Sequence, residues 1–265
     1  MHAVNTAPMP HTTLSTVNTW IGAPFEAPIP AEPDPALISG ADGFAFALGS
    51  NVGASRDLLI WAGRNLARRF AIPGTLRWAP LYLTAPISPI DQDPFLNTVV
   101  LGRIADLRRS PFASNGEEND EALDMSAATE SIDPEERELR KVLGFAKHLE
   151  RAAGRRPGPQ DGPRPLDVDL LFWRETSIDL PAEPSYESQT RQFWATPRPA
   201  TPQPGPWPGP ISVPHPRMTT RRFVLAPLAD LAPRLRLAGQ APVEDLLQSC
   251  ADQEAEQIPW SSKRA

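Results

Sequence analysis

A short stretch places two aspartates inside an apolar, strand-forming run. Residues 162–173 read GPRPLDVDLLFW, with Asp167 and Asp169 among leucine, valine and aromatic side chains. Successive side chains of a strand point to opposite faces, so the two carboxylates should share a face while Val168 points away. Two buried carboxylates repel each other and lose hydration, so such a site alone should be unstable or partly protonated. Mg²⁺ would remove this conflict, because it binds one or two carboxylates and completes its shell with water and phosphate oxygens.

A plainer interpretation is an edge strand whose polar face meets solvent, and the D-x-D pattern alone favours it. Arg164, three residues before Asp167, changes the balance. A guanidinium at this place adds a group that binds phosphate in a fixed, two-pronged geometry. The stretch therefore predicts a site for metal and phosphate.

Proline and charge are unevenly distributed along the 265 residues, which suffice for one sizeable core or two small ones. Of 33 prolines, seven lie in residues 1–40 and eleven in 181–216, so both stretches should be poorly structured. Residues 117–138 hold ten acidic and one basic residue, a local charge of −9. The total of −6 therefore leaves +3 for the remainder. A mildly basic body fits a small anionic ligand better than a nucleic-acid track.

Several classes of protein are disfavoured by what the chain lacks. Cys250 is the single cysteine, so neither an intramolecular disulfide nor a cysteine-rich zinc site is possible. No apolar run approaches the length of a membrane span. The first basic residue is Arg56, which argues against a secretory or transit signal, and we expect a cytoplasmic protein.

Local patterns predict strands and helices that are mixed without strict β-α-β alternation, which indicates a compact, layered α+β domain. The predicted helix near residue 133 has Asp133 as N-cap, Pro134 at its first position, Glu136 at the capping-box position and Gly154 just past its end. The other predicted elements are a strand within 43–53, a helix over 55–70, strands over 78–84 and 95–104, the strand 166–173 and a last helix over 242–250.

Four separated segments resemble the 6-hydroxymethyl-7,8-dihydropterin pyrophosphokinases of folate biosynthesis. They read ALGSN, YLTAPIS…DPFLNTVV, GPRPLDVDLLFW and VPHPRMTTRRFVLAPLADLAP, and they follow one another in the family's order. The resemblance implies a ferredoxin-like α+β fold, with a flexible extension at 1–41 and a catalytic domain over 42–260. This domain would contain an acidic insert at about 109–132 and a proline-rich insert at about 184–210.

The same resemblance implies an activity and its residues. Diphosphate would pass from ATP to the hydroxymethyl oxygen of the pterin, releasing AMP with the help of two Mg²⁺ ions. The implied catalytic residues are Arg155, Arg164, Asp167 and Asp169, of which the two aspartates would bind both ions. The implied ATP-binding residues are Glu150, Arg164, Leu170, Ser212, His215 and Arg221. The implied pterin-binding residues are Thr84, Ala85, Pro86, Phe95, Asn97 and Phe223.

The loop before the D-x-D strand departs from the family's pattern. It is one residue shorter than in a well-known bacterial form, with Asp161 where that form has tryptophan. Pro157 replaces a loop arginine, for which Arg156 could substitute.

Three hypotheses follow for the function. The first is the pyrophosphokinase, a monomer that acts on small molecules without nucleic acid or membrane. The second is another D-x-D metal-dependent nucleotidyl- or glycosyltransferase, which would not explain Phe95, Asn97 and Phe223 together. The third is a catalytically weakened homologue that binds ATP, pterin or a partner protein.

Overall fold

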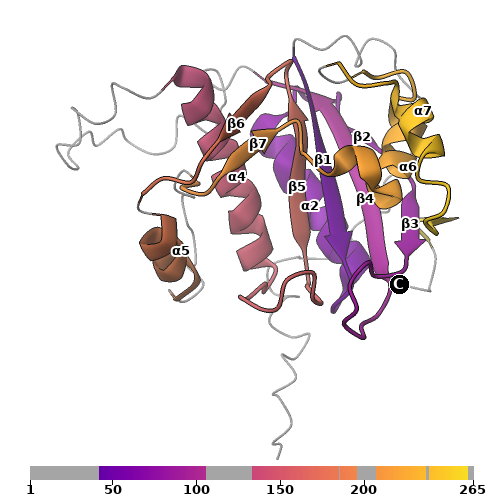
Figure 1. The fold of residues 1–265 in the computed structure, drawn as a ribbon, viewed down its shortest axis with the longest axis horizontal. Coiled ribbons are helices and arrows are strands. Elements are labelled where there is room, and N and C mark those ends of the chain that lie inside the picture. Colours follow the sequence, from indigo (N-terminus) through magenta and orange to yellow (C-terminus); the bar gives the residue numbers. More distant parts are fainter. Residues whose placement is uncertain (1–41, 106–132, 185, 196–206, 237–238, 262–265) are drawn as a thin grey trace, which may run out of the picture.

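An antiparallel sheet forms the centre of the molecule (Figure 1). The computed structural model describes residues 42–105, 133–184, 186–195, 207–236 and 239–261. The main sheet has the strand order β5-β1-β4-β3-β8, with β2 paired to β4, and β6 and β7 form a separate pair. The strands are β1 Gly43–Ser50, β2 Arg77–Trp78, β3 Leu81–Thr84, β4 Phe95–Arg103, β5 Asp167–Trp173, β6 Ile178–Leu180, β7 Ile211–Val213 and β8 Glu256–Ile258. The helices are α2 Ser55–Phe70, α4 Pro134–Ala152, α5 Tyr186–Ala195, α6 Arg222–Leu231 and α7 Val243–Gln248.

The order of elements confirms the predicted ferredoxin-like fold. Strand β1, helix α2, strands β3 and β4, helix α4 and strand β5 follow one another as β-α-β-β-α-β. β1 lies between β4 and β5 and pairs antiparallel with both. This places the end of β1, with its ALGSN segment, beside the first residues of β5.

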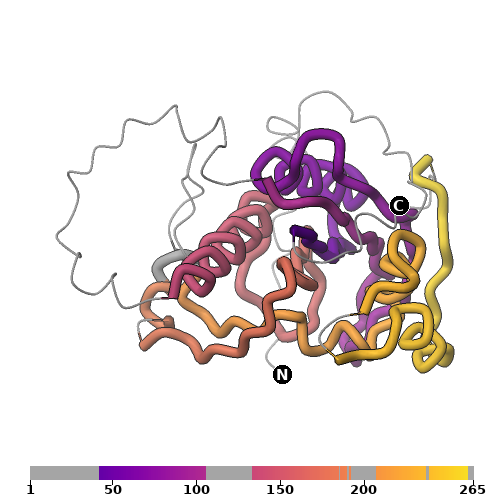
Figure 2. The backbone as a smooth tube through the Cα atoms, turned by 90° about the horizontal axis from the view of Figure 1, so that it is seen from above, coloured from indigo at the N-terminus to yellow at the C-terminus, as the bar shows by residue number. Residues whose placement is uncertain are grey.

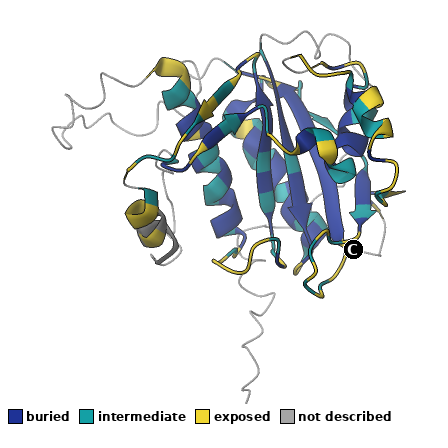
Figure 3. Ribbon diagram, in the orientation of Figure 1, coloured by how far each residue is buried: buried dark blue, intermediate teal, exposed yellow. Residues whose placement is uncertain are grey.

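Each face of the sheet carries its own hydrophobic core. Helices α2 and α4 pack on one face with Phe46, Leu48, Val168 and other buried side chains, which we call core 1. Helices α6 and α7 pack on the other face with Leu171 and its neighbours, which we call core 2. Figure 2 shows the two helical layers from above, and Figure 3 shows that the central strands between them are buried.

The predicted ends of α4 agree with the structure. The side chain of Asp133 accepts hydrogen bonds from the backbone N–H groups of Glu135 and Glu136. Gly154 has φ +99°, the left-handed conformation that glycine adopts without a steric penalty. The carboxylate of Glu136 pairs with Arg140 one turn later. Glu136 therefore occupies the predicted capping-box position and also forms an ion pair within the helix.

Two predicted stretches differ from the structure. The strand expected over 78–84 is divided into β2 and β3 around Pro80, which has no N–H to donate to a ladder. Within the proline-rich stretch 181–216, expected to be poorly structured, α5 and β7 are regular elements. Proline is sparse inside both, which leaves their backbone donors intact.

The predicted extension 1–41 and acidic insert 109–132 lie outside the described residues, as does 196–206 of the proline-rich insert. Among the helices that the structure describes, none is long and apolar enough to cross a membrane.

Gly63 of α2 lies directly beneath the ring of Trp78. A Cβ at residue 63 would come within 2.1 Å of Trp78 Cη2. Trp78 in turn meets the ring of Trp260 edge to face, with centroids 5.6 Å apart. The close approach of helix and strand therefore depends on the missing side chain.

We predict that Gly63→Ala lowers the free energy of unfolding by up to about 2 kcal/mol, measured by urea denaturation. Overpacking of this kind costs about 1–3 kcal/mol, against a gain of about 1 kcal/mol from alanine's helix propensity. In a Trp78→Leu background, which lacks the clashing ring, most of the stability loss caused by Gly63→Ala should disappear. Stabilisation by Gly63→Ala in the wild-type background would contradict the packing described here.

Candidate active site

The two aspartates of β5 share one face, as predicted. Asp167 and Asp169 pair with Gly49 and Ala47 of β1, while Val168 packs into core 1. Their side chains are 21% and 27% exposed, so the expectation that both are buried is wrong. The pair lies at the start of the strand, where the protein leaves one side of both carboxylates open.

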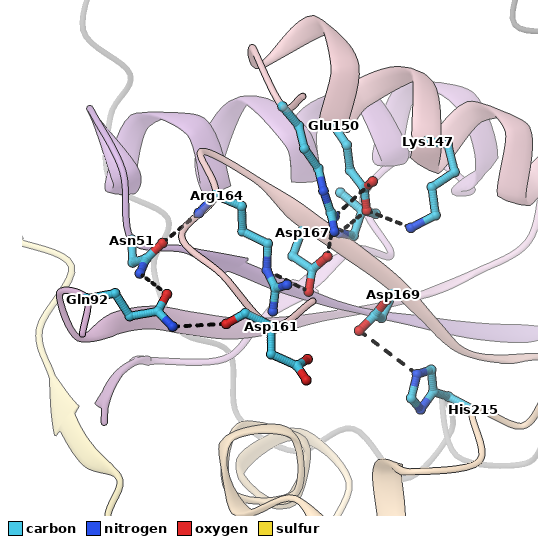
Figure 4. Close-up of polar contacts among 11 residues, drawn as sticks. Asn51, Gln92, Lys147, Glu150, Asp161, Arg164, Asp167, Asp169 and His215 are labelled. Atoms are coloured by element: carbon cyan, nitrogen blue, oxygen red, sulfur yellow. Dashed lines mark hydrogen bonds and ion pairs between the residues drawn. The ribbon is translucent and has the colours of Figure 1, made fainter. Parts of the chain in front are cut away.

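Asp167 is compensated by two arginines, of which Arg164 is labelled in Figure 4. Arg155 Nη1 donates to Asp167 Oδ1 over 2.5 Å, and Arg164 Nε lies 3.3 Å from Asp167 Oδ2. Burial alone would raise the pKa of Asp167, but the charges of Arg164 and Arg155 outweigh it and hold the pKa below its usual value. The predicted protonation of this carboxylate without metal is therefore wrong, because arginines supply the positive charge.

Glu150 ties α4 to the start of β5. Its side chain is 1% exposed. Its Oε1 accepts hydrogen bonds from Lys147 Nζ at 2.7 Å and from the Val168 N–H at 3.0 Å, and its Oε2 lies 3.0 Å from Arg155 Nη1. Burial raises the pKa of Glu150, while the charges of Lys147 and Arg155 oppose that shift. Arg155 thus joins Glu150 and Asp167 in one cluster.

Asn51, the last residue of ALGSN, connects three loops (Figure 4). Its Oδ1 accepts the Arg164 N–H at 2.8 Å, and its Nδ2 donates to Gln92 Oε1 and to the Asp93 carbonyl, both at 3.0 Å. Gln92 Nε2 donates in turn to the carbonyl of Asp161 at 2.9 Å. Asp161 has φ +55°, an uncommon conformation for a residue with a side chain. These bonds fix Arg164 against the end of β1.

All six residues predicted to bind pterin line one cavity of about 410 Å³. They are Thr84, Ala85, Pro86, Phe95, Asn97 and Phe223. Arg164, Asp167 and Arg221 line the same cavity, which places predicted phosphate-binding groups against the predicted pterin pocket. The segments come from three strands, two loops and α6, and the fold brings them together.

Aromatic and amide groups of this cavity are held in fixed positions. Asn97 Nδ2 donates to Thr84 Oγ1 at 2.8 Å, and Asn97 Oδ1 occupies the space where residue 49 would carry a Cβ. The guanidinium carbons of Arg164 and Arg221 each lie 5.3 Å from the ring centroid of Phe95 and Phe223, respectively. Each ring therefore lies beside a cation on one side of the cavity.

The remaining residues predicted to bind ATP are more dispersed. His215 Nε2 lies 4.0 Å from Asp169 Oδ2, and His215 Nδ1 accepts the Arg217 N–H, so the neutral imidazole carries its proton on Nε2. Burial lowers the pKa of His215, with Asp169 opposing the shift. Ser212 is half-buried in β7, and the side chain of Leu170 is 3% exposed in core 1.

Four residues at the site had no role in the sequence prediction. Lys147 contacts Glu150, Gln92 contacts Asn51 and Asp161, and Arg217 and Gln253 line the predicted pterin cavity. Lys147 stands one helical turn before Glu150, a spacing that indicates an ion pair. Arg217 stands in the VPHPRM motif, which could have indicated it, whereas Gln92 and Gln253 carry no local signal because tertiary folding alone brings them to the site.

Comparison with known proteins finds similar sequences over most of the chain. The family model for 7,8-dihydro-6-hydroxymethylpterin-pyrophosphokinase matches residues 110–233. The 2-amino-4-hydroxy-6-hydroxymethyldihydropteridine pyrophosphokinase of Pseudomonas aeruginosa is 29% identical over 213 residues, covering 80% of this chain and 94% of the relative. The chain is therefore similar to the pyrophosphokinases of this family. The family's predicted pterin residues are the ones that meet in the 410 Å³ cavity.

Other similar proteins are larger than this chain. The mitochondrial folate synthesis bifunctional protein of Arabidopsis thaliana is 30% identical over 70% of this chain, which spans 22% of that relative. A solved Plasmodium falciparum HPPK-DHPS structure with pterin and p-hydrobenzoate has 12% identity and a TM-score of 0.48, covering 80% of this chain and 44% of that one. Because this structural similarity is low, the fold assignment rests on the strand order of the sheet.

We predict that Asn51→Asp lowers the free energy of unfolding by about 1–3 kcal/mol, the cost of leaving buried polar partners unpaired. A carboxylate at position 51 has no N–H group to donate to Gln92 Oε1 and to the Asp93 carbonyl. Hydrogen exchange should accelerate in residues 88–94 and 156–164. Asn65→Asp is the matched control, because Asn65 on α2 makes one half-buried bond to the Trp61 carbonyl. Equal effects of the two substitutions would contradict the role of Asn51.

Proposed function

We propose that this protein transfers diphosphate from ATP to 6-hydroxymethyl-7,8-dihydropterin and releases AMP. The observation that carries the proposal is the 410 Å³ cavity, in which all six predicted pterin residues meet Arg164 and Asp167. A flat, polar ring needs aromatic faces and an edge that donates and accepts hydrogen bonds, and Phe95, Phe223 and Asn97 offer these groups.

Asp167 and Asp169 fit Mg²⁺, and we propose them as its protein ligands. Their open sides and oxygen-only chemistry suit a cation that takes one or two carboxylates and completes its shell with water and phosphate. The described residues hold no group of three or more His, Cys, Asp or Glu placed to bind a metal, which agrees with so sparse a protein ligand set. Bound Mg²⁺ would neutralise phosphate charge and orient the triphosphate.

The arginines of the site are placed to hold phosphate oxygens. Arg164 Nε is buried without a hydrogen bond among the described residues, and its partner Asp167 meets it only as a 3.3 Å ion pair. Arg155 pairs with Asp167, and Arg221 lines the same cavity as Asp167. Such donors are strongest with anions, and phosphoryl transfer depends mainly on positioning and charge stabilisation.

The reaction is a single displacement at the β-phosphorus of ATP. The hydroxymethyl oxygen forms the new O–P bond, the bond from the β-phosphorus to the bridging oxygen of AMP breaks, and the hydroxyl proton is lost to solvent or a phosphate oxygen. The cavity holds the ring, so its hydroxymethyl group can be directed at the phosphate site near Asp167 and Arg164. No covalent enzyme intermediate is required, because positioning lowers the barrier.

The proposal also ranks the other hypotheses. Another D-x-D transferase would leave the meeting of Phe95, Asn97 and Phe223 in one cavity without a purpose. The hypothesis of a weakened homologue depends on the altered loop, whose Asp161 lines the cavity. We further propose that the enzyme acts as a cytoplasmic monomer on these small molecules.

Product analysis tests the reaction. Purified protein with ATP, Mg²⁺ and the reduced hydroxymethylpterin should form AMP, and only when the pterin is present. Asp169→Asn should lower the rate at least about a hundredfold, because metal binding supplies several kcal/mol of charge stabilisation. Formation of ADP would indicate an ordinary kinase, and binding of both substrates without turnover would support the weakened homologue.

Phe223→Ala should weaken pterin binding about tenfold, the loss expected for one stacked ring. Isothermal titration of the pterin against both proteins measures the change. The affinity for a non-hydrolysable ATP analogue should stay within about twofold, because the contact of Phe223 is with the ring rather than the phosphates. An unchanged dissociation constant for pterin would remove Phe223 from the pocket.

A further inference from the structure

A second cavity, of about 250 Å³, lies on the α4 side of the site. Its wall includes the cations Lys147, Arg155, Arg156 and Arg164, with Glu150 as the acidic member. Arg164 also lines the predicted pterin cavity, so the two cavities share this side chain. A cavity rich in cations and joined to the phosphate site suits the nucleotide rather than the pterin.

Trp207 is the aromatic residue of this second cavity, and it comes from the proline-rich insert. Arg140 of α4 binds the segment around Trp207 through two groups, its backbone carbonyl and its guanidinium. The Arg140 carbonyl accepts the Trp207 N–H at 2.7 Å. Arg140 Nη1 donates to the carbonyls of Trp207 at 2.9 Å and Gly209 at 3.2 Å. The Arg140 side chain is only 6% exposed, so this anchor is part of the folded body.

The indole of Trp207 is fixed in orientation. It packs so closely on Gly209 that a Cβ there would lie 2.3 Å from the indole Nε1. Tyr186 of α5 meets the ring edge to face, with centroids 5.7 Å apart. The ring is half-buried, so part of it remains available at the cavity. A rigid indole beside several cations is a surface on which a nucleobase can stack while its phosphates meet the cations.

We propose that Trp207 is a specificity-determining residue of the proposed reaction, forming an aromatic wall for the base of the nucleotide donor. This inference rests on the proposed function, because that function supplies the nucleotide. It also assigns a task to the proline-rich insert, whose end delivers Trp207 to α4. The base contacts the indole, and the triphosphate extends towards Arg164 and Asp167.

Binding measurements separate stacking from charge. The probes are α,β-methylene-ATP, which lacks the bond to be cleaved, and inorganic tripolyphosphate, which lacks the base, both with Mg²⁺. Trp207→Ala should weaken binding of the ATP analogue about tenfold, with tripolyphosphate and pterin changed by less than about twofold. Trp207→Phe should recover most of the affinity. Equal losses for the two phosphate probes, or no loss for either, would overturn the proposal.

Gly209→Ala gives an independent test, because it displaces the indole without deleting it. It should reproduce the selective loss of Trp207→Ala, and unchanged affinity for the ATP analogue would count against the proposal. Trp61→Phe, an aromatic replacement on α2, is the control and should leave all three affinities unchanged. Wild-type release of AMP tests the proposed function separately. An active wild type with an unchanged Trp207→Ala variant refutes only the role of Trp207.

Discussion

The contact on which the site depends is the pair of ion pairs made by Arg155. One guanidinium nitrogen meets both Glu150, at the end of α4, and Asp167, at the start of β5. With Lys147 beside Glu150, two cations balance two carboxylates in a place with little water. Removing Arg155 would leave the buried Glu150 with Lys147 as its remaining cation in this cluster, and breaking a buried pair usually costs far more than the pair itself contributes. The helix end, the strand and the loop between them are therefore positioned by electrostatics as well as by packing.

This arrangement divides the site around Arg164. On one side lies the cavity with Phe95 and Phe223, and on the other lies the cavity with Lys147 and Trp207. The backbone of Arg164 is held by Asn51, so its position is set by the end of β1 rather than by a bound ligand. A phosphate-binding group between two cavities suits a reaction that joins two substrates. Preorganised donors of this kind lower a barrier without having to reorganise during the reaction.

The features predicted from sequence are those with local physical causes. Helix α2 begins and ends where its apolar spacing and flanking turns indicate, and Asp133 caps α4 as its residue type and position imply. The shared face of the D-x-D pair follows from the two-residue period of a strand. The compensation of Asp167 was not predicted, because Arg155 lies twelve residues earlier and reaches it only in the folded chain. Helix α5 was missed because high overall proline content hid a stretch without proline.

The residues of the candidate site also divide into those with a local signal in the sequence and those placed by long-range contacts. The residues predicted for pterin stand in two of the four sequence motifs, and the fold aligns those motifs. Trp207 stands in a low-complexity stretch where sequence alone assigns no role to any position. Its place at the second cavity depends on the long-range anchor of Arg140. Lys147 could have been noticed from its spacing to Glu150, but its half-buried position depends on packing that sequence does not reveal.

The position of β8 has a consequence for the order in which the site is assembled during synthesis. β8 pairs with the outer edge of β3, and Trp260 donates to the Ala79 carbonyl beside it. Thr84, at the end of β3, and Gln253, just before β8, line the same cavity. Translation proceeds at roughly 5–20 residues per second, so the ribosome must add some 170 residues after Thr84 before that edge is paired. The proposed pterin pocket is thus among the last parts of the domain to be completed, and until then β3 presents an open edge to the cell.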